Sequence, residues 1–387
     1  MATWSISPVV DWLMHKGRHL PTREAVVGEL CLRVRAAGLP IERVAFFFYA
    51  LHPQYFGVAL YWDGGKVSSR PGNHAFLETA EYRDSPAARI SAGARAIRRR
   101  LDVPAGQLDF PFLRELKDAG LTDYVIAEVV FSDGVRNSVS LATRRPGGFT
   151  EHDIAEIEEL LHPFALVLEI HSGRELARTL LETYLGRISG SRVLDGQIKR
   201  GDGQSIDAVI WFSDLRESTP LSAALGEQRF LELLNDYFAA TAGAVLEHGG
   251  EVLRFIGDAS LAVFPTSGEE LRAVCGRAVD AARSARARVL AANAARRSAG
   301  VAEFACGIGL HVGRVHYGNI GTPERLEFSV IGVAANMAAR IEALCKETGE
   351  DVVLSSSVAA QLGMRCRSLG KFALRGVSGA EEIFALP

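Results

Sequence analysis

Residues 251–264 read EVLRFIGDASLAVF, and this stretch decides how the second half of the chain is interpreted. Two apolar runs, each long enough for a strand, are joined by Gly257-Asp258, a dipeptide typical of a tight β-hairpin turn. An aspartate in such a turn is most often only a turn former. A carboxylate at a hairpin tip can also bind a metal ion, and a second carboxylate nearby would favour that function.

A second aspartate follows a strand upstream of the hairpin. The run AVIWF at 208–212 is continuously apolar, as expected for a strand buried on both faces, and Ser213-Asp214 follow at its end. A helix predicted over 228–246 separates this strand from the hairpin. Alone, Asp214 fits a helix cap better than a functional residue. Together with Asp258, it could hold two metal ions that activate one oxygen and neutralise another in phosphoryl chemistry.

The third piece lies downstream. Residues 304–321, FACGIGLHVGRVHYGNIG, predict glycine-punctuated strands, and residues 325–342, RLEFSVIGVAANMAARIE, lead into a helix. Asn336 and Arg340 are four residues apart on that helix, so their side chains share one face. An amide and a guanidinium on one face suit an oxygen-rich anionic transition state. Spacing alone slightly favours a solvated helix face.

Together these pieces resemble the class III nucleotidyl cyclase domain, the catalytic domain of adenylate and guanylate cyclases. The resemblance covers about residues 206–386. It implies a ferredoxin-like α+β fold for a catalytic domain at 205–387, acting as a head-to-tail homodimer. The segments that carry it, in the family's order and spacing, are FSDLREST (212–219), RFIGDASLAVF (254–264), GIGLHVGRVHYGNIG (307–321) and VIGVAANMAARIE (330–342).

The resemblance also implies roles for individual residues. Asp214 and Asp258, with the backbone carbonyl of Leu215, would bind two Mg²⁺ or Mn²⁺ ions per active site. Asn336 would orient the ribose, and Arg340 would stabilise charge at the α-phosphate as the 3′-oxygen attacks and pyrophosphate leaves. Contacts to the phosphates are expected from the segment after Leu215 and from a basic residue near the C-terminus, namely Arg216, Glu217, Ser218, Thr219 and Arg375.

The chain holds one copy of this pattern. The aspartate pair of one protomer would therefore meet Asn336 and Arg340 of another. A homodimer with two equivalent active sites is required for catalysis under this interpretation.

Two positions that read the purine base in this family are unusual here. Arg254 stands where adenylate cyclases usually have Lys, and Ser329 stands where many have Asp, although a bacterial subgroup uses Thr or Ser there. Arginine only donates hydrogen bonds, which suits adenine N1, and Ser329 can accept one from the adenine amino group. The sequence therefore favours ATP and an adenylate cyclase that forms 3′,5′-cyclic AMP. The alternatives are a guanylate cyclase and a catalytically weak nucleotide-binding relay.

Residues 1–148 resemble a GAF-type sensory domain in architecture. A helix around 25–37, apolar runs at 44–51 and 56–62, and two strands at 124–142 joined through Asp133-Gly134 predict a mixed α and β fold. A small-molecule or protein regulator would act there. The alternative is a folded domain that only aids dimerisation.

Residues 149–204 are predicted to form a helical connector. Thr150 and Asp153 have the spacing of a capping box, and apolar residues then recur at helical spacing. Pro163 and Gly173 are expected to kink or interrupt the helix. The connector either packs on its own domain or dimerises and carries a signal.

Composition limits the remaining possibilities. A chain of 387 residues predicts two domains, and its 43 Lys and Arg nearly balance its 46 Asp and Glu, so nucleic acid and membrane partners are not expected. Five scattered cysteines without a C-x-x-C pair predict reduced thiols. No window approaches the roughly 20 apolar residues of a membrane span. We therefore expect a cytoplasmic protein.

Overall fold

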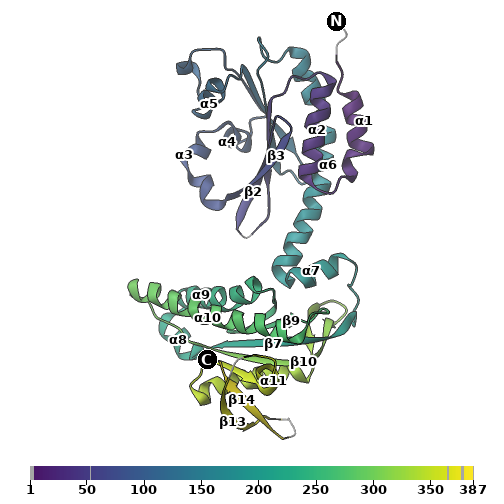
Figure 1. The fold of residues 1–387 in the computed structure, drawn as a ribbon. Helices are drawn as coiled ribbons and strands as arrows, with labels where there is room; N and C mark the ends of the chain where they lie inside the picture. The colour runs from purple at the N-terminus through teal and green to yellow at the C-terminus, as the bar shows by residue number, and fades with distance from the viewer. Residues whose placement is uncertain (1–3, 53, 364–365, 376–378, 387) are drawn as a thin grey trace. The chain divides into compact units, whose positions relative to one another are not determined.

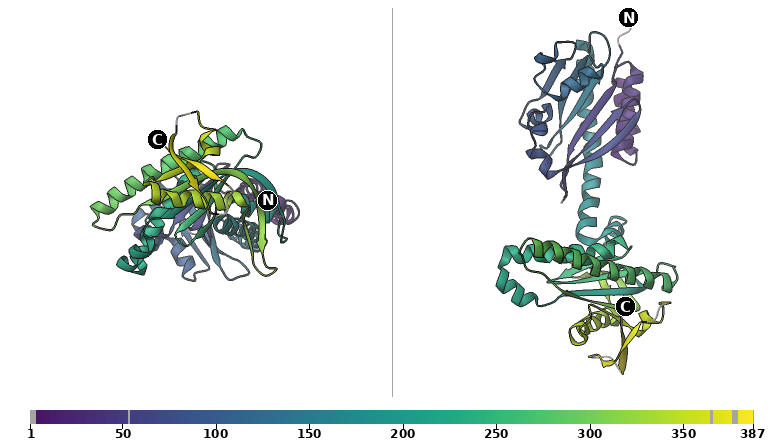
Figure 2. Two further views of the ribbon diagram at one scale, coloured as in Figure 1. Left: turned by 90° about the horizontal axis from the view of Figure 1, so that it is seen from below. Right: turned by 60° about the vertical axis from the view of Figure 1, so that its left-hand side comes forward.

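The computed structural model describes residues 4–52, 54–363, 366–375 and 379–386. It divides the chain into two compact units, Met1–Leu180 and Leu181–Pro387 (Figures 1 and 2). The division falls inside the segment predicted as the connector, so part of that segment belongs to each unit. Within the described part of the chain, no helix is long and apolar enough to span a membrane.

The N-terminal unit is built on a six-stranded antiparallel sheet with the strand order β3-β2-β1-β6-β5-β4. The predicted strands at 44–51 and 56–62, and the pair around Asp133-Gly134, are confirmed to within a few residues. The strands are β1 (Arg43–Tyr49), β2 (Tyr55–Asp63), β3 (Lys66–Asn73), β4 (Ala96–Arg100), β5 (Asp123–Val130) and β6 (Arg136–Thr143).

Helices cover both faces of this sheet. Alternate strand residues such as Phe46, Leu60 and Val139 pack against three helices on one face, and Tyr124 and Ile126 pack with shorter helices on the other (Figure 1). The first face is covered by α1 (Ser7–His15), α2 (Arg23–Ala37) and α6 (Glu151–Leu185). The remaining helices are α3 (Ala80–Arg83), α4 (Pro86–Ser91) and α5 (Phe112–Asp118), with 3₁₀ turns at Gly17–His19, His74–Glu78 and Ala105–Gln107.

The start of α6 is the predicted capping box. The Asp153 amide donates to Thr150 Oγ1 at 3.1 Å, and the Thr150 amide donates to Asp153 Oδ2 at 2.7 Å. Of the predicted kink or interruption at Pro163 and Gly173, the interruption is wrong, because α6 runs through both residues. An internal proline costs about 3 kcal/mol. Burial of neighbouring apolar side chains, such as Phe164, against the sheet offsets that cost.

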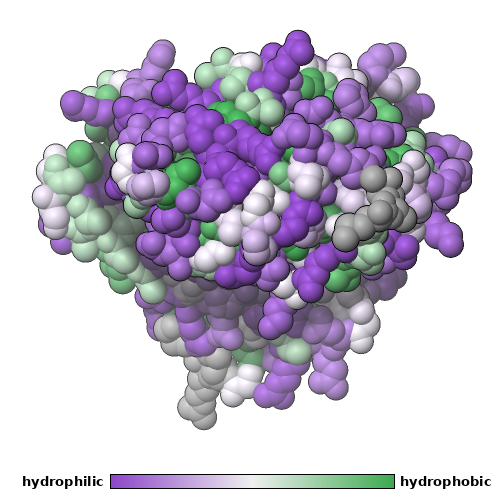
Figure 3. Space-filling view, turned by 90° about the horizontal axis from the view of Figure 1, so that it is seen from above, coloured by the Kyte–Doolittle hydropathy of each residue, from purple (hydrophilic) through white to green (hydrophobic). Residues whose placement is uncertain are grey.

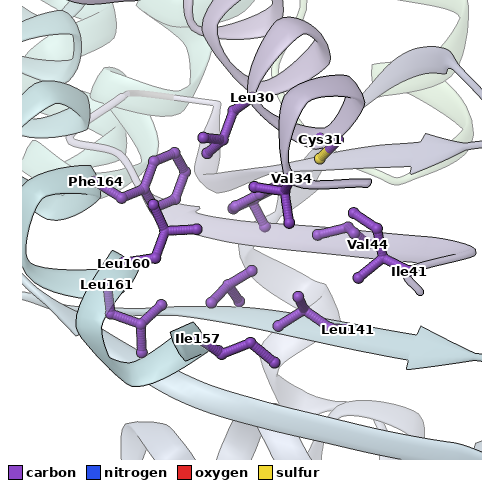
Figure 4. A pocket seen from close by; sticks show the side chains of 12 residues that line it. Leu30, Cys31, Val34, Ile41, Val44, Leu141, Ile157, Leu160, Leu161 and Phe164 are labelled. Atoms are coloured by element: carbon purple, nitrogen blue, oxygen red, sulfur yellow. The ribbon is translucent and has the colours of Figure 1, made fainter. Parts of the chain in front are cut away.

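The core beneath α6 contains a cavity of about 30 Å³ (Figure 4). Its lining is apolar and includes Leu30, Cys31, Leu160 and Phe164. A void of this size holds about one water-sized probe, and apolar walls give a water no hydrogen-bond partners. The cavity therefore offers no polar group that could orient a polar ligand. On the face shown in Figure 3, apolar residues are scattered among hydrophilic ones, as is normal for a folded surface.

The C-terminal unit contains an eight-stranded sheet with the order β13-β14-β12-β10-β7-β9-β8, in which β11 pairs with the far end of β10. Its strands are β7 (Gly203–Leu215), β8 (Glu251–Ile256), β9 (Ala259–Pro265), β10 (Cys306–Gly321), β11 (Leu326–Ile331), β12 (Val352–Ser355), β13 (Arg367–Ala373) and β14 (Ala380–Ala385). Its helices are α7 (Arg187–Leu194), α8 (Ser218–Leu225), α9 (Glu227–Glu247), α10 (Leu271–Ser298), α11 (Val333–Thr348) and α12 (Ser356–Ala359).

The centre of this sheet confirms the expected ferredoxin-like topology. The elements β7-α9-β8-β9-α10-β10 form a β-α-β-β-α-β unit with the antiparallel strand order β10-β7-β9-β8. Alternate residues of β7 face opposite layers: Val209 and Trp211 pack in the core with α9 and α10, whereas Ala208 and Ile210 pack with α11 (Figure 1). The continuous apolar run of β7 is explained by this double burial.

Glycines on β10 let α11 lie very close to the sheet. A Cβ atom at Gly309 would lie 2.6 Å from the Ala338 carbonyl oxygen, and one at Gly313 would lie 2.5 Å from the Ala334 Cβ. Since real Cβ atoms do not approach other atoms this closely, these positions require glycine. The close contact fixes how α11 presents its outer face.

The short helix α7 is tied into the same unit by a buried polar network. Glu251 at the start of β8 accepts hydrogen bonds from the Ser189 amide at 2.7 Å and from Ser189 Oγ at 2.9 Å. The Tyr317 hydroxyl donates to the other Glu251 oxygen and lies 2.9 Å from Ser189 Oγ. All three residues are buried, so α7 is part of this unit's core.

Candidate active site

Two neighbouring strands bring Asp214 and Asp258 together. Asp214 at the end of β7 lies opposite Ala259 at the start of β9, and the Leu215 amide donates to the Asp258 carbonyl oxygen at 3.4 Å. The hairpin predicted from 251–264 is confirmed, with Asp258 in the turn between β8 and β9. The two carboxylates singled out in the sequence therefore occupy one end of the sheet.

The chemistry of this pair fits a divalent cation. Asp214 Oδ1 is buried and has no hydrogen-bond partner within the described part of the chain. Burial, followed by the negative charge of Asp258, raises the pKa of Asp214 to about 6. Two carboxylates that disfavour each other's charge are stabilised by a cation between them, and Mg²⁺ or Mn²⁺ prefers such oxygen ligands.

Arg216 is already engaged within its own chain. Its guanidinium donates to the carbonyl oxygens of Cys345, at 3.2 Å, and Glu350, and its amide donates to Ala305 O at 2.9 Å. The Cys345 carbonyl lies in the last turn of α11, where a cation also interacts favourably with the helix dipole. Arg216 thus links the aspartate loop to α11, and the structure does not aim it at a phosphate.

The next residues of the loop have an unusual backbone. Glu217 has a φ of 57°, in the left-handed region that favours glycine, and it precedes the first turn of α8. Ser218 and Thr219 form that turn, whose amides have no acceptors within the helix. Free amides at a helix start can bind an anion, and strained residues cluster at functional sites.

Asn336 and Arg340 lie on the side of α11 that faces away from its own sheet. Ala334 and Ala338 contact β10, and with about 3.6 residues per turn Asn336 points about 180° away from them. Asn336 is exposed and Arg340 is half-buried. Within the described part of the chain, neither side chain has a hydrogen bond or ion pair. They lie on the opposite side of α11 from its contacts with β10.

A third residue, Glu327, lies next to the two positions predicted to read the base, and the sequence analysis missed it. Arg254 Nε lies 2.9 Å from Glu327 Oε1. Glu327 and Ser329 are two residues apart on β11, so their side chains point to one face of the strand. Ser329 Oγ is buried without a partner in the described part of the chain. The sequence did contain a signal for Glu327, because this acidic residue stands two positions before Ser329 and would share its face of a strand.

Arg375 is not on any of the strands or helices that carry the other predicted site residues. It is exposed and lies in a turn just after β13. No hydrogen bond or ion pair holds its side chain among the residues that the structure describes. Its expected phosphate contact gains no support from this position.

Residues 202–387 match the family described as "Adenylate and Guanylate cyclase catalytic domain". Adenylate cyclase 1 of Rhizobium meliloti is 30% identical over 185 residues, which are 46% of this chain and 27% of that protein. The adenylate cyclase of Anabaena cylindrica is 32% identical over 169 residues, 43% of this chain and 32% of that protein. The chain therefore spans about a third or less of these relatives' length.

Among solved structures, the adenylyl cyclase CyaB from P. aeruginosa is 25% identical, with a TM-score of 0.45. The similarity covers 48% of this chain and 95% of that one. The candidate site, from Asp214 to Arg375, lies wholly within the segment matched by the family. Residues 202–387 of this chain are a class III adenylyl and guanylyl cyclase catalytic domain.

Proposed function

We propose that this protein is an adenylate cyclase that converts ATP to 3′,5′-cyclic AMP and pyrophosphate in a homodimer. The observation that carries the proposal is the convergence of Asp214 and Asp258 inside the matched segment, where Asp214 Oδ1 is buried and has no hydrogen-bond partner among the described residues. In this proposal the chain consists of a sensory region (1–148), a connector (149–204) and a catalytic domain (205–387).

Asp214, Asp258 and the Leu215 carbonyl would hold two Mg²⁺ or Mn²⁺ ions. When bound, these ions supply charge stabilisation at the reacting oxygens. The 3′-oxygen of ATP bonds to the α-phosphorus, and the bond to the pyrophosphate leaving group breaks. The amides of Ser218 and Thr219 are placed to bind phosphate oxygens at the start of α8.

The direction of α11 supports a site shared between two chains. Asn336 and Arg340 point away from the sheet that carries the aspartates, so we infer that a second copy supplies them to orient the ribose and neutralise the α-phosphate. Large apolar side chains are exposed beside both halves of the site, including Phe255, which is 53% exposed next to Arg254, and Val333, which is 71% exposed at the start of α11. Exposed apolar residues in such positions suit an interface between copies.

The residues at the predicted base-reading positions, Arg254 and Ser329, support ATP as the substrate. Glu327 engages Arg254 through Nε, which leaves the terminal guanidinium nitrogens to donate to adenine N1. The unpartnered Ser329 hydroxyl can accept from the adenine amino group. The same Glu327 carboxylate could instead accept from guanine N1–H, which is the observation that keeps cyclic GMP formation as the second candidate.

The N-terminal unit is proposed to regulate catalysis as a GAF-like sensory domain. Its six-stranded antiparallel sheet, covered by helices on both faces, supports this assignment. A ligand would act by binding two conformations of the unit with different affinity.

The test is a product assay with the purified full chain, Mn²⁺ and either ATP or GTP. We expect cyclic AMP from ATP and much less cyclic GMP from GTP. Product mainly from GTP would reverse the base assignment. Absence of product from both, with Mn²⁺ binding intact, would leave the nucleotide-binding relay as the function.

A further inference from the structure

A third acidic side chain, Glu342 on α11, lies beside the aspartate pair. A Cβ atom built at Gly307 of β10 would collide with Glu342 Oε1, so the carboxylate fills the space over this glycine. Gly307 lies directly opposite Asp214 in the register of β10 and β7. Residues directly opposite each other in an antiparallel pair point to the same face, with Cα atoms about 4.5–5.5 Å apart. The Glu342 carboxylate thus lies on the face of Asp214, one strand away.

The Glu342 side chain is buried, with 8% of its surface exposed, and has no hydrogen-bond or ion-pair partner of its own among the described residues. Burial, followed by the negative charge of Asp214, raises the pKa of Glu342 to about 7. Arg216 is the nearby cation, but its guanidinium donates to the backbone carbonyls of Cys345 and Glu350. Keeping a buried acid charged is costly, and a cation bound at the neighbouring aspartates would offset that cost.

We propose that Glu342 is an outer carboxylate of the metal centre. It accepts hydrogen bonds from water on the ion held by Asp214 and Asp258, and its charge strengthens binding of that ion. Within the described part of the chain, no three acidic, histidine or cysteine side chains lie close enough to ligate one ion together, so Glu342 acts through water. It is a positioning residue, and the proposal rests on the proposed function in that the two aspartates bind the ion.

The test is Mn²⁺ binding to the full chain without nucleotide, measured by calorimetry. Loss of an outer-shell partner typically weakens metal binding about 10–100-fold, and we expect this for Glu342→Gln. Glu347→Gln is the matched control, because Glu347 is an exposed acid on the same helix, and it should bind like the wild type. Asp214→Asn should lose binding more severely.

The outcomes separate the two proposals. Wild-type affinity in Glu342→Gln, together with loss in Asp214→Asn, would overturn the role of Glu342 alone. Unchanged binding in Asp214→Asn would overturn the metal site itself.

Thermal unfolding provides a readout that a merely structural role would not move. Without metal, Glu342→Gln should unfold at the same or a higher temperature than the wild type, because an uncompensated charge is gone. Saturating Mn²⁺ should then raise the Tm of the wild type more than that of the variant. An equal loss of Tm with and without Mn²⁺ would assign Glu342 a structural role and overturn the proposal.

Discussion

Replacing Glu251 with alanine should destabilise the C-terminal unit strongly. Glu251 is 2% exposed and accepts hydrogen bonds from the Ser189 amide, the Ser189 hydroxyl and the Tyr317 hydroxyl. After removal of the carboxylate, the two hydroxyls can still pair with each other across 2.9 Å, but the amide and one hydroxyl donor lose their partner. Each buried unsatisfied donor costs about 1–3 kcal/mol, so the sum is about 4 kcal/mol.

Two further variants calibrate this prediction. Tyr317→Phe removes one donor and leaves the carboxylate paired with Ser189, so about 1–2 kcal/mol is expected. Glu247→Ala removes a carboxylate that is 64% exposed and paired with Arg288 on the surface, for which about 0–1 kcal/mol is expected.

The assay is urea unfolding of the full chain, followed by hydrogen exchange of peptides from 187–194 and 251–256. These peptides report the C-terminal unit separately from the N-terminal one. Faster exchange in both peptides should accompany the loss of stability. A Glu251→Ala variant as stable as Glu247→Ala would refute the reasoning, because the network would then contribute no more than a surface ion pair.

Three other predictions concern the active site. Arg254→Lys should keep or raise cyclic AMP formation, and a large loss in the product assay would show that the guanidinium reads the base in another way. Mixing Asp258→Ala with Arg340→Ala protein should partly restore activity that neither variant has alone; no recovery after confirmed subunit exchange would contradict a site shared between chains. The raised pKa of Asp214 makes its ionisation destabilising in metal-free protein, so stability should fall as pH rises from its ordinary pKa of 3.8 through about 6. Thermal unfolding with a chelator should therefore show Asp214→Asn above the wild type at pH 7 and level with it below about pH 4, and equal curves at pH 7 would contradict the effect.

Local patterns predicted the parts of the site that depend on local structure. The Gly257-Asp258 turn and the apolar run before Asp214 specify a hairpin and a buried strand, and both were found. The shared helix face of Asn336 and Arg340 followed from their spacing. In each case the relevant information lies within about 15 residues, where strand and helix periodicity are readable.

Contacts between distant segments were beyond the sequence. Arg216 appeared to belong to the phosphate loop, but its partners Cys345 and Glu350 lie at the end of another helix. The pairing of Arg254 with Glu327 depends on how β8 and β11 approach in space. The continuity of α6 through Pro163 depends on packing against the sheet, which outweighs the local cost of the proline.

The glycines of β10 have a consequence for how catalysis can be switched. The backbone of α11 lies directly over Gly309 and the Ala334 side chain lies directly over Gly313, so a shift of the helix by even one residue would press larger side chains against these glycines. α11 and β10 therefore move as one rigid piece. In the proposed homodimer, Asn336 and Arg340 would therefore not be withdrawn from a substrate by sliding their helix within its own unit, and we expect control of activity to act on how the two catalytic units are placed against each other.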